Sequence, residues 1–191
     1  MESNLRWYKE KNLDRLSSVL LDKGYLIHRV FSVKDAQEKI LSLLDKEKTT
    51  ALGDSWELMD KEFINRLREY NFYDRFKGES EKIKRESLTA HTAIIEGEYI
   101  TENGQILIVG DYNTSSALFG AENLIVLVSE NKIIKDVNTG FDKIKENEKY
   151  YQLRARRLNN INEGFSIGII ENGKKFEKRI SVVMSVENTG L

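Results

Sequence analysis

Residues 24–57 read GYLIHRVFSVKDAQEKILSLLDKEKTTALGDSWE, and this stretch alternates between strand and helix patterns. Residues 25–31 form a short β-prone run, and Ser32 and Asp35 have the spacing of a capping box. Residues 36–44 then carry apolar side chains at helical intervals. A second strand at residues 49–52 runs into Gly53, where the next helix is expected to start. This order predicts an α/β fold with parallel strands and crossover helices.

The same patterns continue on both sides of this stretch. Residues 4–23 have the apolar spacing of an amphipathic helix that ends near Gly24. Residues 92–100 and 105–109 flank Asn103-Gly104, a strong signal for a β-hairpin. Residues 124–128, Leu-Ile-Val-Leu-Val, predict a buried strand, followed by a charged helix from about 134 to 149. Residues 165–170 and 176–186 predict a terminal hairpin, and residues 1–191 are expected to form one domain.

The composition indicates a folded protein rather than a disordered chain. The 191 residues are 40% apolar with a net charge of −1, which argues against a nucleic-acid binder. The absence of cysteine excludes disulfides, thiolate nucleophiles and cysteine-ligated metal centres. We therefore expect no metal and no cofactor. No apolar run approaches the ~20 residues of a membrane span, and no secretory signal is recognised, so a cytoplasmic protein without a membrane partner is expected.

Several blocks of the chain, in order, resemble the LUD domain, the lactate-utilisation family. They are WYKEKNL (7–13), GDS (53–55), YITENG (99–104), LFG (118–120), VSENKIIKD (128–136), RRLN (156–159) and RISVVMSV (179–186). The resemblance implies a three-layer α/β fold with a mostly parallel sheet, akin to ribose-5-phosphate isomerase, glucosamine-6-phosphate isomerase and the CoA transferases. It also implies a role connected with lactate or a similar organic acid.

The chain departs from this family at specific places. Residues 161–178 stand where many short members have a cysteine-rich segment, and they contain no cysteine. The loop GDYNTSS at 110–116 lacks the family's Gly-Asn-Arg signature, and His91 stands where Asp is common. Two functions remain open. One is a binding protein or an enzyme that takes a small anionic metabolite; the other is a non-catalytic regulatory or structural subunit with a degenerate site.

The segment Gly53, Asp54 and Ser55 is the first candidate site. It lies where a parallel strand ends, which is where open α/β sheets bind ligands. A helix starting there would offer free N–H groups to a phosphate or carboxylate. In the alternative interpretation, Asp54 is only the N-cap of that helix and Glu57 completes a capping box.

Glu96, Glu98 and Glu102 form a series of carboxylates along one strand and its turn. Glu96 and Glu98 are expected to point the same way, because side chains alternate along a strand. Two close carboxylates raise one of their pKa values and supply a general acid or base. The alternative is a solvated strand face.

The remaining candidates lie in loops at strand ends. Asp111 and Asn113 offer polar contacts after one strand, and Lys132 offers an ammonium after another. The candidate ligand-binding set is Gly53, Asp54, Ser55, Thr101, Asn103, Gly104, Asp111, Asn113 and Lys132, with Asp54, Glu98 and Asp111 as catalytic candidates. Arg154, Arg156 and Arg157 are expected on a solvated helix face unless they meet an acidic partner or a phosphate. The expected partners are a small anionic metabolite and either a second copy or lactate-utilisation proteins.

Overall fold

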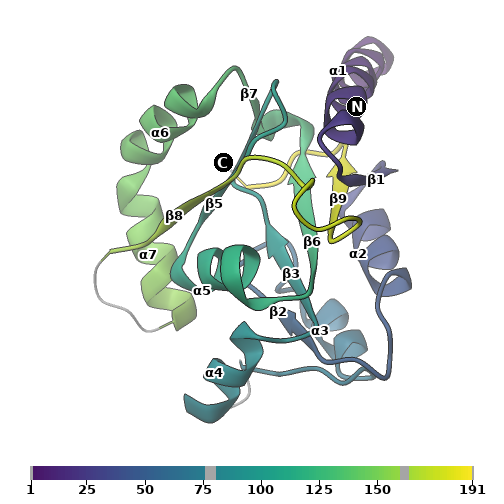
Figure 1. Cartoon of the computed structure of the whole chain (residues 1–191). Coiled ribbons are helices and arrows are strands. Elements are labelled where there is room, and N and C mark those ends of the chain that lie inside the picture. Colours follow the sequence, from purple (N-terminus) through teal and green to yellow (C-terminus); the bar gives the residue numbers. More distant parts are fainter. Residues whose placement is uncertain (1, 76–80, 160–163, 191) are drawn as a thin grey trace.

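A five-stranded parallel sheet forms the centre of the molecule (Figure 1). The computed structural model describes residues 2–75, 81–159 and 164–190. In spatial order the large sheet contains β1 (Leu26–Val30), β9 (Ile180–Ser185), β6 (Asn123–Ser129), β3 (Thr92–Glu96) and β2 (Thr50–Leu52). Every neighbouring pair is parallel. The predicted α/β class with a mostly parallel sheet is confirmed.

Helices α2 (Val33–Ser42) and α3 (Lys61–Leu67) cover one face of this sheet. Their apolar side chains pack against Leu52, Ile94, Ile125, Leu127 and Val183 of the strands. The predicted capping box at the start of α2 is present, since Ser32 and Asp35 bond each other's backbone N–H. Helix α4 (Glu81–Leu88) contacts β2, the strand at one edge of the large sheet. None of the helices in the described part has the length and apolar character needed to cross a bilayer.

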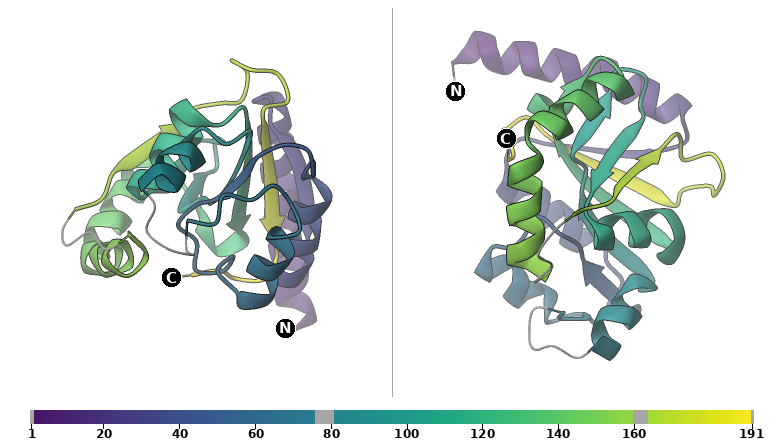
Figure 2. Two further views of the ribbon diagram at one scale, coloured as in Figure 1. Left: turned by 90° about the horizontal axis from the view of Figure 1, so that it is seen from below. Right: turned by 90° about the vertical axis from the view of Figure 1, so that its left-hand side faces the viewer.

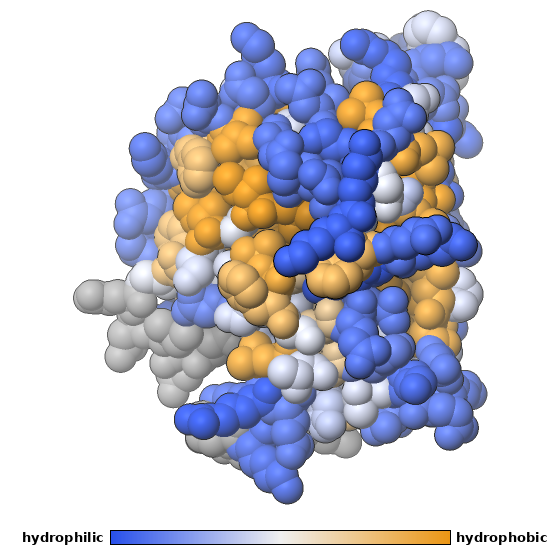
Figure 3. Space-filling view, in the orientation of Figure 1, coloured by the Kyte–Doolittle hydropathy of each residue, from blue (hydrophilic) through white to orange (hydrophobic). Residues whose placement is uncertain are grey.

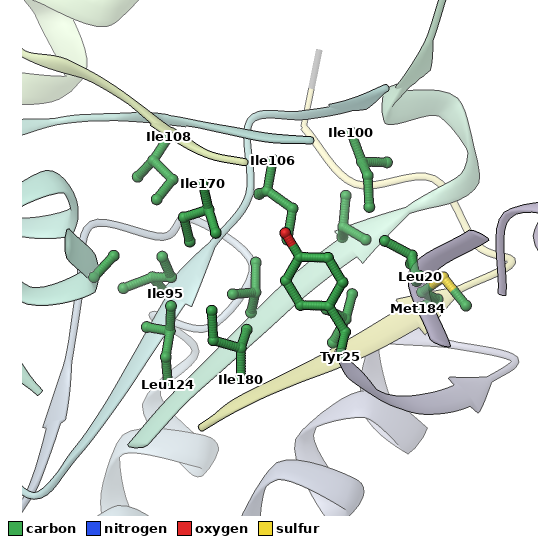
Figure 4. Packing of buried hydrophobic residues seen from close by; sticks show 14 of the residues in the cluster. Leu20, Tyr25, Ile95, Ile100, Ile106, Ile108, Leu124, Ile170, Ile180 and Met184 are labelled. Carbon is green, nitrogen blue, oxygen red and sulfur yellow. The ribbon is translucent and has the colours of Figure 1, made fainter. Parts of the chain in front are cut away.

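A second, four-stranded sheet faces the other side of the large sheet. It contains β7 (Ile133–Ile134), β4 (Tyr99–Thr101), β5 (Ile106–Val109) and β8 (Ile167–Ile170), in that order. Figure 4 shows the core between the sheets, where Ile95, Leu124 and Ile180 of the large sheet meet Ile106 and Ile170 of the small one. Helix α1 (Ser3–Asp22) contributes Leu13, Leu16 and Leu20 to the same core.

Helices α6 (Val137–Glu146) and α7 (Glu148–Asn159) pack on the outer face of the small sheet. Figure 2 (left) shows α7 on one side of the molecule and α1 and α2 on the other. Figure 3 shows apolar residues over the small sheet, framed by hydrophilic ones. A short helix α5 (Asp111–Ser115) and a π-helical turn η1 (Ser116–Gly120) connect β5 to β6.

The predicted strand at residues 92–100 is two strands in two sheets. The chain leaves the large sheet after Glu96 and enters the small sheet at Tyr99. A Cβ on Gly97 would lie 3.0 Å from a methyl group of Val126 and 3.3 Å from one of Ile106, so glycine permits this crossing. The predicted hairpin around Asn103-Gly104 is confirmed, because β4 and β5 pair antiparallel.

The predicted terminal hairpin at residues 165–186 is wrong. Strand β8 pairs antiparallel with β5 in the small sheet, whereas β9 lies between β1 and β6 in the large sheet. The Asn172-Gly173 signal marks a turn that packs against the end of α1, where Gly173 N donates to the Lys23 carbonyl. Strand β9 is buried along its whole length, as is typical of a central parallel strand.

Candidate functional site

A cluster of buried polar side chains lies at the carboxyl edge of the large sheet. We call Ser55, Glu96, Glu98, Lys132 and Arg154 the carboxyl-edge cluster. Ser55 follows β2, Glu96 ends β3, and Lys132 ends the turn η2 (Glu130–Lys132) that follows β6. Glu98 lies in the link to β4, and Arg154 reaches in from α7. Each residue is at most 5% exposed. Ligands of open α/β sheets bind at this edge, so the cluster lies where such sheets bind their ligands.

Glu98 is the centre of an ion-pair network in the cluster. Lys132 Nζ lies 3.2 Å from Glu98 Oε1, and Arg154 Nη1 lies 2.9 Å from Glu98 Oε2. The other terminal nitrogen of Arg154 donates to the Val109 carbonyl at 3.3 Å. Burial by itself raises the pKa of Glu98, but the charges of Arg154 and Lys132 outweigh burial and lower it. Glu98 is therefore an ionised, doubly paired carboxylate.

Glu96 has a different environment from Glu98. Ser55 Oγ donates a 2.9 Å hydrogen bond to Glu96 Oε2, and among the described residues no cation forms an ion pair with Glu96. Burial and the nearby charge of Glu98 raise the pKa of Glu96 to about 7, against the opposing effects of Lys132, Arg154 and Ser55. Glu96 can therefore gain or lose a proton near neutral pH.

The interpretation of these glutamates as a solvated face is wrong. Glu96 and Glu98 are 5% and 3% exposed, because the chain passes from one sheet to the other between them. Only Glu102, the third carboxylate of the series, is exposed, in the β4–β5 turn.

Asp54 belongs to a buried ion pair and not to a helix cap. It pairs with Arg75, whose guanidinium also lies 4.2 Å above the ring of Tyr112. Helix α3 begins at Lys61, eight residues after Gly53, and Asp60 is its N-cap. Both the N-cap at Asp54 and the helix start at Gly53 are therefore wrong, and the residues after β2 form a loop.

The loop after β2 packs closely against α5, where the side chain of Asn113 lies against the backbone of Gly53 and Asp54. Asn113 Oδ1 accepts from Asp54 N at 2.7 Å, and Asn113 Nδ2 donates to the carbonyls of Asp54 and Val109, each at 3.1 Å. A Cβ on Gly53 would lie only 2.1 Å from Asn113 Oδ1. The predicted proximity of Gly53, Asp54, Ser55 and Asn113 is thus observed.

The other predicted site residues lie in two separate places, near Asp54 and at the β4–β5 turn. Asp111 is exposed, accepts a hydrogen bond from Ser166, and lines a cavity of about 10 Å³ with Asp54 and Arg154. That volume has room for about one water molecule. Thr101, Asn103 and Gly104 form the β4–β5 turn; Thr101 Oγ1 accepts from Gln105 N and Gly104 packs against α1. The hydrogen bond of Thr101 thus holds the hairpin, and Gly104 lies against α1 and not against the cluster.

A C-terminal segment covers the carboxyl-edge cluster. We call residues 187–190 the strap. Thr189 N donates to Ser129 Oγ at 3.1 Å, Asn131 Nδ2 donates to the Thr189 carbonyl at 3.1 Å, and Gly190 N donates to Glu57 Oε1 at 2.9 Å. A Cβ on Gly190 would lie 3.0 Å from Lys132 Nζ and 3.7 Å from Glu96 Oε1. The strap therefore lies directly against the cluster.

A groove of about 660 Å³ lies next to the strap, between α1, the β4–β5 turn and η2. Its walls include Asn12, Arg15, Glu102, Glu130 and Asn131. Asn131 lines the groove and also holds the strap. Asn131 thus connects the groove with the strap.

Arg154 and Arg75 are the functional candidates that the sequence patterns miss. Arg154 was expected on a solvated face with Arg156 and Arg157, yet it is buried while those two are exposed. Tyr151, three residues earlier, is buried on the same inner side of α7. Because residues three positions apart share one face of a helix, the spacing of Tyr151 and Arg154 could have indicated from the sequence that Arg154 faces inward.

Comparisons with known proteins agree with this architecture. A family model of the LUD domain matches residues 13–185. None of the curated protein sequences matches the chain. The fold is similar to the 1.70 Å crystal structure of a DUF162 family protein from Deinococcus radiodurans, with a TM-score of 0.59, 94% of this chain and 98% of that chain covered, and 12% sequence identity. At this identity the structural likeness concerns the fold alone.

Proposed function

This chain belongs to the LUD domain family, and we propose that it binds a small anionic metabolite at its carboxyl-edge cluster, with organic acids related to lactate as the expected class. The observation that carries the proposal is the convergence of two buried cations, Lys132 and Arg154, on one carboxylate at this edge of the sheet. Because the sequence contains no cysteine, the protein has no thiolate ligand for an iron–sulfur cluster.

The energetics of the cluster favour a binding role over a purely structural one. Removing charges from water costs several kcal/mol per ion, and well-packed apolar residues often stabilise a fold as well as a buried ion pair does. The core between the sheets is apolar, whereas the buried charges gather where parallel strands end. Buried, mutually perturbed titratable groups in such a place are typical of functional sites.

Ligand entry requires the cluster to open. The small cavity beside Asp54 and Arg154 holds no more than about one water molecule, so an organic acid does not fit into it. The strap is held by hydrogen bonds to α1, to the start of α2, to the β6–η2 segment and to Glu57, and it lies near the groove that Asn131 lines. In the proposed function the strap moves aside and the ligand reaches Lys132 from the groove.

A ligand screen with matched arginine variants tests the proposal. The panel contains lactate, pyruvate, other organic acids, sugar phosphates and CoA esters, and the readouts are the thermal shift and calorimetric titration. We expect an organic acid to stabilise the wild type and Arg156→Met, whose side chain is exposed on the same helix, but to bind Arg154→Met at least tenfold more weakly. Arg154→Lys, which keeps the charge, should recover part of the affinity.

The alternative function gives a different outcome. If no member of the panel shifts or titrates the wild type, the anion-binding proposal fails. A non-catalytic regulatory or structural subunit then becomes the better interpretation. In that case light scattering should show a stable oligomer or co-purification should yield a partner.

A further inference from the structure

The charges of the carboxyl-edge cluster balance only when Glu96 is ionised. The cluster holds two cations, Lys132 and Arg154, and two carboxylates, Glu96 and Glu98. The neighbouring Asp54–Arg75 pair is neutral as a unit and does not change this balance. An ionised Glu96 therefore leaves no net positive charge for a ligand, whereas a protonated Glu96 leaves one.

The geometry identifies Glu96 as the carboxylate that takes the proton. Glu98 is paired with both cations, at 3.2 Å and 2.9 Å, so protonating it would break two ion pairs. Glu96 has a hydrogen bond from the neutral hydroxyl of Ser55, and protonation breaks no ion pair among the described residues. A protonated carboxyl can still accept this hydrogen bond on its second oxygen.

The groups that face Glu96 come from every element around it. The charged ones are Glu98 from the β3–β4 link, Lys132 from η2 and Arg154 from α7, and Tyr150 of α7 is neutral at physiological pH. Ser55 and the backbone of Gly190 in the strap face it without charge. A pKa of about 7 for Glu96 is consistent with this balance.

We propose that the ligand of this site is a monoanion, and that Glu96 takes up one proton when the ligand binds. The proposal rests on the proposed function of the cluster. A single negative charge beside Lys132 and Arg154 restores the balance that the ionised Glu96 provides in the closed site. A dianion would leave an uncompensated buried charge, which is unfavourable. The structure thus favours monocarboxylates over dicarboxylates and phosphate dianions.

The proposal predicts how affinity depends on pH. Binding that consumes one proton weakens once Glu96 is ionised in the free protein, so the Kd of a monoanion should rise above about pH 7. The rise should approach tenfold per pH unit. Glu96→Gln is neutral at every pH and keeps the shape of the protonated side chain, so its Kd should be flat and, at pH 8, lower than that of the wild type.

The experiment is calorimetric titration of the full chain from pH 5.5 to 8.5. The probes are acetate, glycolate, lactate and pyruvate as monoanions, with malonate, malate and inorganic phosphate as dianions at the upper end of the range. The variants are the wild type, Glu96→Gln and, as a matched control, Glu146→Gln, whose side chain is exposed at the end of α6. Repeating the wild-type titration at pH 8 in two buffers of different ionisation enthalpy counts the protons taken up.

Each result of these titrations either supports or overturns the proposal of a monoanionic ligand. Monoanion binding that weakens above pH 7 in the wild type and in Glu146→Gln, is flat in Glu96→Gln, and consumes about one proton supports the proposal. A Kd that is independent of pH in the wild type, or tighter binding of a dianion at pH 8, overturns it while anion binding stands. If no probe binds any variant at any pH, the proposed function fails and this inference fails with it.

Discussion

Replacing Glu96 by glutamine should change how the stability of the protein depends on pH. Burial raises the pKa of Glu96 from its usual 4.5 to about 7 in the folded protein, so the folded state holds this proton more tightly than the unfolded state. The stability that results is fully present below pH 4.5 and is lost as the pH rises to about 7. The difference of about 2.5 pKa units, at 1.36 kcal/mol each, corresponds to about 3 kcal/mol.

The glutamine variant has no such dependence, because its side chain does not titrate. Relative to the wild type, its free energy of unfolding should therefore rise by about 3 kcal/mol between pH 4.5 and pH 8. Urea unfolding of both proteins across this range, with Glu102→Gln as the control, measures the difference and cancels the titration of all other groups. If the difference between Glu96→Gln and the wild type is the same at both ends, the carboxylate of Glu96 has an ordinary pKa and our electrostatic account of the cluster is refuted.

Three further changes test the cluster and its cover. Arg154→Met leaves Glu98 buried with one cation instead of two and should lower the free energy of unfolding by about 3 kcal/mol, measured by urea denaturation. Gly53→Ala forces the amide of Asn113 away and should cost about 1–3 kcal/mol in the same assay. Deleting residues 188–191 uncovers Lys132, so an amine-modifying reagent should label it in the truncated protein and not in the wild type, as mass spectrometry of the peptides will show.

The elements that the sequence predicts well are those defined by local patterns. The capping box at Ser32 and Asp35, the apolar strand that contains Leu124, and the hairpin at Asn103-Gly104 depend on residues close together in the chain. Local patterns do not tell which strands pair. Asn172-Gly173 has the same local signal as Asn103-Gly104, yet the strands on either side of it belong to different sheets.

The place of the candidate site in the fold was predictable from the sequence, but the contacts within it were not. Parallel strands bring their carboxyl ends to one edge, so Ser55 and Lys132 were expected to be neighbours of the same crevice. The burial of Glu96 and Glu98 depends on the crossing at Gly97, and alternation along a strand does not reveal it. The partner of Arg154 lies 56 positions away in the sequence, and no local pattern distinguishes this arginine from the exposed Arg156.

The strap packs closely against the cluster. Gly190 has a φ of 58°, a backbone conformation that favours glycine, and any side chain there would meet Lys132 Nζ. Thr189 is 1% exposed, and its hydroxyl lies 2.6 Å from that of Ser129, the last residue of β6. A segment that needs a glycine against a buried ammonium and buries a threonine beside a strand end occupies one defined position. Because that position is directly over Lys132 and Glu96, the proposed ligand and the strap would compete for the same space. Under the proposed function, the measured affinity for an anion therefore includes the free energy of lifting the strap.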